Sequence, residues 1–122
     1  ILALQAHDGG AIAAPSIAPL DLEKAVAQDF DTIARAAQER WGRLDGLVLN
    51  AALLGQPMPI EEYDIPTWVR VMHVNVTGVF LSVCAVLPVM RRGKWGRIIN
   101  IASQAAKTGF PHLPAYVSSK HG

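Results

Sequence analysis

The chain has 122 residues, of which 51% are hydrophobic and 17% are charged, and its formal net charge is +1. This composition excludes an intrinsically disordered chain, and the near-neutral charge gives no electrostatic reason to expect nucleic acid as a partner. A single cysteine excludes an internal disulfide framework and favours a reducing compartment, so we expect a cytoplasmic protein. The four histidines show no metal-ligand spacing, and we expect no metal site.

The first twenty residues carry the weakest signal. Residues 1–5 read as the tail of a helix, which the paired glycines Gly9 and Gly10 end. Residues 11–21 are apolar but contain Pro15 and Pro19, and proline cannot donate to a strand ladder. We predict a strand in part of this segment, mainly because a helix follows it.

A helix is predicted from residue 26 to residue 41, because apolar side chains recur there every three or four positions opposite a charged side. Residues 44–50 are then predicted to be a short strand that is entered through Asp45 and Gly46. Its apolar run is typical of a buried parallel strand covered on both faces. A loop rich in proline and acidic residues follows, and a plain connector is the simplest interpretation of it.

Residues 68–92 are apolar on nearly every side. Length favours a helix despite the many valines, because strands rarely exceed about ten residues. We expect one side to cover the sheet; it carries Trp68, Met72, Val76, Val79, Val83, Val86 and Met90. The opposite side then needs another cover, from the same chain or from a second subunit; it carries Val69, Val71, Val74, Leu81 and Cys84. Polar residues interrupt the segment, so we expect no membrane span.

Residues 97–103 form a second apolar run, predicted to be a buried strand, and a helix follows the loop at residues 109–114. Helices therefore alternate with strands, and the crossovers are long enough for parallel pairing. This order predicts the α/β fold class.

Three residues near the C-terminal end suit carbonyl and alcohol chemistry. Ser103 closes the second strand, Tyr116 follows 13 residues later, and Lys120 lies four positions further on, on the same helix face. A tyrosine can exchange a proton near neutral pH only when a neighbouring cation stabilises its phenolate form. A serine hydroxyl can hold the substrate oxygen beside it.

Further motifs surround these residues in a characteristic order. Asn50-Ala51-Ala52 follows the first strand, Asn75 lies in the long helix, and the runs 96–103 and 115–122 carry the serine, tyrosine and lysine. From about Asp21 to the last residue, this pattern resembles the classical short-chain dehydrogenase/reductase family.

The resemblance implies a Rossmann-like doubly wound parallel sheet that lacks its first two strands and its last strand, with residues 1–122 as one partial dinucleotide-binding domain. It also implies NAD or NADP as cofactor, a small carbonyl or alcohol substrate, and a homodimer or homotetramer in which the long helix lies at a subunit interface. Hydride transfer between the cofactor and the substrate is the activity expected. The alternatives are a non-catalytic scaffold of the same fold and an inactive truncated fragment.

The same resemblance assigns roles to individual residues. Tyr116 is expected to be the general acid or base, and Lys120 to assist it and to bind the nicotinamide ribose. Ser103 is expected to orient the substrate, and Asn75 to support a water chain to Lys120, unless its side chain is satisfied within its own helix. Residues 50–52 are expected to lie along the cofactor at the carboxyl end of the strand.

Asp21 is the least specific of these matches. It is expected either to bind the adenine or to cap the helix that follows.

Two departures from the family pattern stand out. Ala52 replaces the usual glycine of the Asn-Ala-Gly motif, and the 122 residues contain no glycine-rich phosphate turn. The sequence therefore does not select between NAD and NADP. In this fold the two missing strands lie between the strand in residues 11–21 and the strand in residues 44–50, so we do not expect these two strands to be neighbours. Only runs 44–50 and 97–103 are expected to pair, and the isolated chain is expected to pack loosely.

Overall fold

The computed structural model describes residues 2–4, 7–8, 11–12 and 16–122. Its strands are β1 (Leu2–Leu4), β2 (His7–Asp8), β3 (Ala11–Ile12), β4 (Ser16–Ala18), β5 (Gly46–Leu49) and β6 (Arg97–Asn100). Its α-helices are α1 (Ala27–Trp41), α2 (Ile65–Met72), α3 (Gly78–Arg92) and α4 (Pro114–His121). The shorter helical turns are η1 (Ile60–Glu62), η2 (His73–Thr77) and η3 (Gln104–Ala106).

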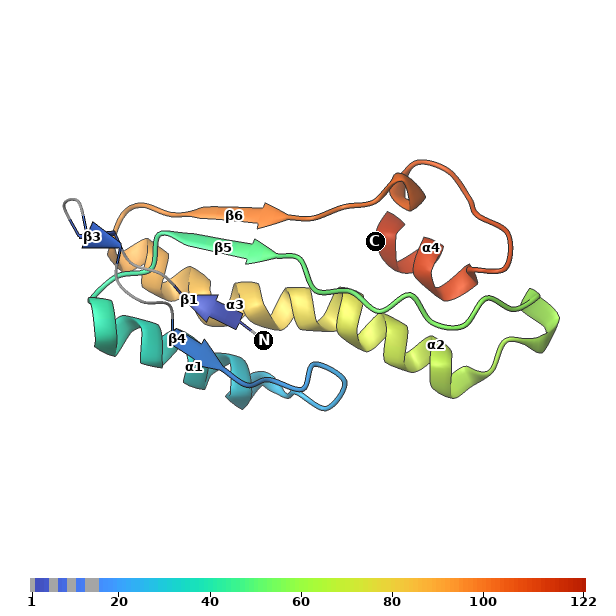
Figure 1. Ribbon diagram of the computed structural model, residues 1–122, viewed down its shortest axis with the longest axis horizontal. Coiled ribbons are helices and arrows are strands. Elements are labelled where there is room, and N and C mark those ends of the chain that lie inside the picture. The colour runs from blue at the N-terminus through green and yellow to red at the C-terminus, as the bar shows by residue number, and fades with distance from the viewer. Residues whose placement is uncertain (1, 5–6, 9–10, 13–15) are drawn as a thin grey trace.

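Strands β5 and β6 form the parallel pair that organises the fold. They run side by side in one direction (Figure 1), and their register places Gly46 opposite Arg97 and Leu49 opposite Asn100. This pairing confirms the predicted α/β class with a partial parallel sheet. It also confirms that residues 44–50 and 97–103 contain neighbouring strands.

The core lies between this pair and two helices. Leu47 of β5 packs with Ala34 of α1 and with Val86 and Met90 of α3, so both helices cover the same face of the strands. The opposite face is open among the described residues, where Val48 is 53% exposed. The prediction that both strands are buried on two faces is therefore wrong, and every residue of β6 is exposed. A continuously apolar strand can be covered on both faces, but in the described part of the chain helices pack against only one face.

Helix α1 confirms the periodic pattern that predicted it. Phe30, Ala34 and Ala37 are buried along one side. The Asp29 carboxylate accepts a hydrogen bond of 2.8 Å from the backbone N–H of Val26, which satisfies a donor at the helix start. Gly42 ends the helix in the left-handed conformation, with φ of 71°, which a residue with a Cβ adopts less readily.

Helices α2 and α3 continue through the π-helical turn η2 into one helix from Ile65 to Arg92. The Asp64 carboxylate caps its start by accepting a hydrogen bond of 2.8 Å from the backbone N–H of Thr67, and these Thr67 hydrogen bonds lower the pKa of Asp64. By length and composition alone, this helix is long and apolar enough to cross a membrane. Core helices of folded domains meet the same criterion, and here Val71 and Val86 pack inside the domain.

The buried side of this long helix matches the predicted side in α3, where Val86 and Met90 are buried, but differs from it in the first half of the helix. Val71 and Val74 are 0% and 6% exposed, although we had assigned both to the side facing away from the sheet. Their helical neighbours along the buried stripe are Asn75, Gly78, Val86, Val89 and Met90. The exposed side carries Val69, Phe80 and Cys84 instead. Because the first half of the helix is apolar all round, hydrophobicity could not select the side that packs there.

The N-terminal segment forms two antiparallel ladders in place of the predicted helix tail. β1 pairs with β4, with Leu2 opposite Ala18, and β2 pairs with β3. The ladders give hydrogen-bond partners to backbone N–H and C=O groups, many of which would have no partner in so short a helix. The strand predicted within residues 11–21 is present as β3 and β4, although residues 13–15, like residues 1, 5–6 and 9–10, lie outside the described part. As expected, this segment does not neighbour β5.

Candidate active site

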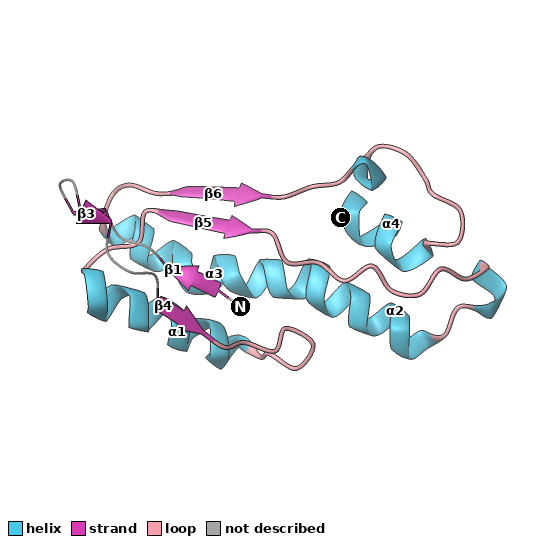
Figure 2. Ribbon diagram, viewed as in Figure 1, coloured by secondary structure: helices cyan, strands magenta, loops and turns pink. Residues whose placement is uncertain are grey.

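The candidate site lies where the carboxyl ends of β5 and β6 meet the long helix and α4. In Figure 2 both strands point toward this end, and α4 lies beside the segment that leaves β6. Helix α4 packs against α2, η2 and η3. Residues that are far apart in the sequence are thus gathered at the edge where open α/β sheets bind ligands.

Tyr116 and Lys120 lie one turn apart on α4, as their spacing predicted. The Lys120 Nζ atom is 5.8 Å from the centroid of the Tyr116 ring. It also donates a hydrogen bond of 3.1 Å to the carbonyl oxygen of Ile101, just beyond the end of β6. The ammonium is therefore held between the aromatic ring and the residue that follows β6.

Ser103 lies two residues beyond Ile101 and is half-buried. It precedes η3, and its hydroxyl accepts a hydrogen bond of 3.2 Å from the backbone N–H of Ala105. Because η3 packs against α4, the segment that carries Ser103 is fixed against the helix that carries Tyr116 and Lys120. The Ser103 hydroxyl keeps its own proton available for donation to a substrate oxygen.

Asn75 is buried, with 8% of its surface exposed, and its side chain joins three elements. Its Oδ1 accepts a hydrogen bond of 2.7 Å from the backbone N–H of Leu53, and its Nδ2 donates one of 2.9 Å to the Leu53 carbonyl. The same Nδ2 donates a second bond of 2.9 Å to the Ser119 hydroxyl on α4. The alternative that Asn75 is satisfied within its own helix is therefore wrong.

Ser119 is a residue that the sequence analysis missed. It is 4% exposed, and besides accepting from Asn75 its hydroxyl donates a hydrogen bond of 2.8 Å to the carbonyl oxygen of Tyr116. Ser119 thus links the long helix to the turn of α4 that carries the tyrosine. No local pattern signals this role, because the contact with Asn75 spans 44 residues of sequence.

A second group of missed residues holds the segment between β4 and α1. The Arg70 guanidinium pairs with the Glu23 carboxylate through two hydrogen bonds, of 2.9 and 3.2 Å. The His73 Nε2 atom lies 3.1 Å from the carbonyl oxygen of Ala25. Both contacts join positions nearly fifty residues apart in the sequence, so no local sequence motif predicts them.

Asp21 lies in this segment and is exposed. Its carboxylate accepts a hydrogen bond of 3.1 Å from the backbone N–H of Glu23, and its carbonyl accepts from Lys24 and Ala25. These bonds build a tight turn. The alternative that Asp21 caps the following helix is wrong, since α1 begins six residues later, at Ala27, and its N-cap is Val26.

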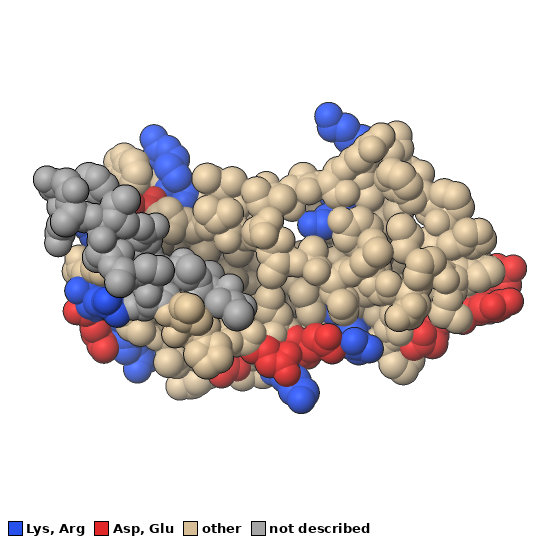
Figure 3. Space-filling model, viewed as in Figure 1, with Lys and Arg blue, Asp and Glu red and all other residues tan. Residues whose placement is uncertain are grey.

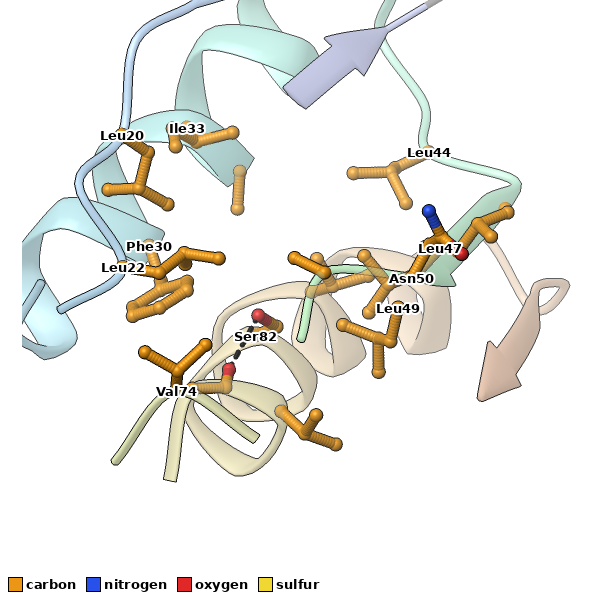
Figure 4. A pocket seen from close by; sticks show the side chains of 17 residues that line it. Leu20, Leu22, Phe30, Ile33, Leu44, Leu47, Leu49, Asn50, Val74 and Ser82 are labelled. Atoms are coloured by element: carbon orange, nitrogen blue, oxygen red, sulfur yellow. Dashed lines mark hydrogen bonds between the residues drawn. The ribbon is translucent and has the colours of Figure 1, made fainter. Parts of the chain in front are cut away.

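An apolar cavity of about 210 Å³ opens between α1, the long helix and β5. Figure 4 shows Leu20, Leu22, Phe30 and Ile33 on one side of it and Leu44, Leu47, Leu49 and Asn50 on the other, with Val74 and Ser82 beneath. Asn50 and Ala51, two of the predicted cofactor-binding residues, line this cavity, whereas Ala52 is exposed and does not. In the space-filling view, charged side chains gather along the rim and most of the middle of this face is uncharged (Figure 3).

Tyr63 was not singled out by the sequence. Its hydroxyl is buried without a hydrogen-bond partner among the described residues, beneath Gly55. Burial raises the pKa of this hydroxyl, and the neighbouring Asp64 carboxylate adds to the shift. Within the described ranges, no three His, Cys, Asp or Glu side chains are grouped so that they could hold a metal ion.

Comparison with known proteins connects this geometry to a family. A sequence model for short chain dehydrogenases matches residues 6–122. An uncharacterized oxidoreductase of Bacillus subtilis, YxjF, is 40% identical over 99% of this chain and 44% of its own length. The 2-dehydro-3-deoxy-L-rhamnonate dehydrogenase (NAD(+)) of a Sphingomonas species is 35% identical over 99% of the chain and 51% of its own length. The chain thus spans about half the length of these relatives.

Solved structures agree. A protein from Pseudomonas syringae described as a short chain dehydrogenase superposes with a TM-score of 0.82 at 36% identity, over 88% of this chain and 43% of that one. A short chain dehydrogenase of Escherichia coli CFT073, solved in complex with NADPH, gives a TM-score of 0.77 at 33% identity, over 84% of this chain and 42% of that one. These matches support a partial Rossmann-like α/β fold for the chain.

Proposed function

Because the chain belongs to the short chain dehydrogenase family, we propose that the whole protein is an oxidoreductase that transfers a hydride between NAD or NADP and a small carbonyl compound or secondary alcohol. The observation that carries the proposal is the position of Lys120 between the Tyr116 ring and the end of β6. Relatives of this chain include an NAD(+)-dependent sugar-acid dehydrogenase and a D-beta-hydroxybutyrate dehydrogenase, whose names both describe oxidation of an alcohol.

The chemistry divides between the cofactor and three side chains. The nicotinamide, when bound, supplies or accepts the hydride. In reduction, the Tyr116 hydroxyl gives its proton to the substrate oxygen as the carbonyl carbon becomes the alcohol carbon; in oxidation, the phenolate takes the proton from the alcohol. The Lys120 ammonium stabilises that phenolate by its charge, and the Ser103 hydroxyl donates a hydrogen bond to the substrate oxygen.

Asn75 and Ser119 set the geometry of this group in our proposal. Their hydrogen bond fixes α4 to the long helix, and the bond from Ser119 to the Tyr116 carbonyl fixes the turn below the tyrosine. Both Nδ2 protons of Asn75 are engaged. Any support that Asn75 gives to water beside Lys120 must therefore come from its backbone or from a second lone pair of its Oδ1.

We further propose that residues 1–122 contribute one part of a dinucleotide-binding domain. Asn50 and Ala51 line the cavity, Asp21 and Leu22 lie in the turn at its mouth, and Lys120 lies at the end of β6. The apolar lining of the cavity suits an adenine ring, Asn50 supplies a polar group at the end of β5, and Lys120 is proposed to bind the nicotinamide ribose. The methyl group of Ala52 is exposed and leaves the cavity free. No glycine-rich phosphate turn occurs in the 122 residues, so they provide no equivalent anchor for the phosphates.

The exposed side of the long helix supports the proposal of a homodimer or homotetramer. Phe80 is 64% exposed and Val69 56%, and Cys84 lies on the same helix. Large apolar side chains grouped on an exposed helix face are characteristic of surfaces that pair with another chain. A second copy of this helix is the partner we propose.

A direct test is to incubate the whole protein with NAD+ or NADP+ and a panel of small secondary alcohols, and to follow the absorbance of the reduced nicotinamide. We expect reduction of at least one cofactor that depends on both protein and alcohol. Binding of the cofactor without turnover of any alcohol, or of any carbonyl compound in the reverse assay, would favour the non-catalytic scaffold instead.

A further inference from the structure

The turn formed by residues 21–25 borders the apolar cavity through Leu22. Leu20 and Leu22 line the cavity from this side (Figure 4), across from Asn50 just after β5. Residues 19–26 belong to no strand or α-helix. Their position opposite β5 is therefore set by contacts other than a strand ladder.

Two side chains from one turn of the long helix supply such contacts. Arg70 and His73 are three positions apart, so both lie on the same helix face. The Arg70 guanidinium binds the Glu23 carboxylate with two parallel hydrogen bonds, a geometry that fixes direction as well as distance. The His73 Nε2 must carry its proton, because its partner 3.1 Å away is the Ala25 carbonyl oxygen, which can only accept.

The next residue of the helix, Val74, lines the cavity floor. A single helical segment, residues 70–74, thus both forms part of the cavity and holds the turn that closes it. The two contacts hold the turn at Glu23 and at Ala25, both just after Leu22, so the turn cannot pivot about a single point. A shift of the turn would change the width of the cavity between Leu22 and Asn50.

We propose that Arg70 and His73 are positioning residues for the adenine end of the cofactor, which hold the 21–25 turn so that Asp21 and Leu22 face the ligand. This inference rests on the proposed function, since it assigns the cavity mouth to the adenine portion of NAD or NADP. Neither side chain touches the cofactor in this proposal. Both act through the backbone of the turn.

The Arg70–Glu23 pair is well suited to a test that separates positioning from stability. Both side chains are partly exposed, 52% for Arg70 and 42% for Glu23, and exposed pairs contribute little to folding. We therefore expect Arg70→Gln in the whole protein to leave the thermal midpoint nearly unchanged. We expect the dissociation constants of the preferred dinucleotide and of adenosine monophosphate, measured by calorimetry, to rise about fivefold.

Matched variants control this experiment. Arg43→Gln removes a similar exposed pair, with Asp45, that does not involve the 21–25 turn, and it is expected to leave the affinity unchanged. The exchange of Glu23→Arg together with Arg70→Glu restores an ion pair and is expected to restore most of the affinity. His73→Leu removes the donor to Ala25 and is expected to weaken binding, whereas His73→Gln keeps an N–H donor and is expected to bind nearly as wild type does.

Each outcome decides the inference. Weaker binding in Arg70→Gln, recovery in the exchanged pair and an unaffected Arg43→Gln control support it. Unchanged affinity in Arg70→Gln and His73→Leu, or an equal loss in the Arg43→Gln control, overturns it and leaves the proposed function standing. A wild-type protein that binds neither dinucleotide would refute the proposed function itself. It would refute the inference as well, because the turn would then have no adenine to bind.

Discussion

Replacing Asn75 with alanine removes the side chain that joins the loop after β5, the long helix and α4. Three hydrogen bonds disappear: two with the backbone of Leu53 and one with the Ser119 hydroxyl. A hydrogen bond contributes about 1 kcal/mol net to stability, and Asn75 is buried, so the groups left behind are poorly reached by water. We expect Asn75→Ala to lower the free energy of unfolding of the whole protein by about 3 kcal/mol.

Urea denaturation followed by circular dichroism measures this loss as a lower midpoint with an unchanged slope. Ser82→Ala is the matched control on the same helix, because the Ser82 hydroxyl donates only to the Gly78 carbonyl within its own helix. We expect that control to cost under about 1 kcal/mol. Combining Asn75→Ala with Ser119→Ala is expected to cost less than the sum of the two single losses, since one bond is counted in both. Equal losses in Asn75→Ala and Ser82→Ala would refute the reasoning.

Three further outcomes are expected. Gly55→Ala forces a side chain into a residue with φ of 78° and places its Cβ 2.6 Å from the Tyr63 hydroxyl, so the free energy of unfolding is expected to fall by more than about 1 kcal/mol in urea titrations. Because the pKa of Asp64 is lowered in the fold, thermal melts are expected to show wild type more stable than Asp64→Asn at neutral pH, with the difference vanishing as the pH falls through that depressed value, below about pH 4. Phe80→Asp is expected to convert an oligomeric wild type to monomers in sedimentation experiments, and a monomeric wild type would contradict the proposed interface.

Sequence patterns predicted the elements whose signals are local. Helix α1 follows from a regular apolar period and ends at Gly42, and β5 and β6 follow from short apolar runs between turns. The parallel pairing of β5 and β6 follows from the length of the crossover between them. Tyr116 and Lys120 share a helix face because their spacing alone requires it.

Other features depend on contacts between distant parts of the chain. The N-terminal residues form strands because β4 is available to pair with β1. Helix propensity depends only on neighbouring residues, so it cannot predict pairing with a strand further along the chain. The packed side of the long helix includes Asn75 and Gly78, which no hydrophobicity pattern would select. The contacts of Ser119, Arg70 and His73 span more than forty residues, so only the folded chain reveals them.

The central claim is that Tyr116 exchanges the proton with the substrate, and Tyr116→Phe tests it most directly. The substitution removes one hydroxyl while the ring, and its contact with Lys120, stay in place. In the whole protein we expect the turnover number to fall by at least about a hundredfold, with the dissociation constant of the dinucleotide within about twofold of wild type. A Tyr116→Phe variant that retains near-normal turnover would contradict the account.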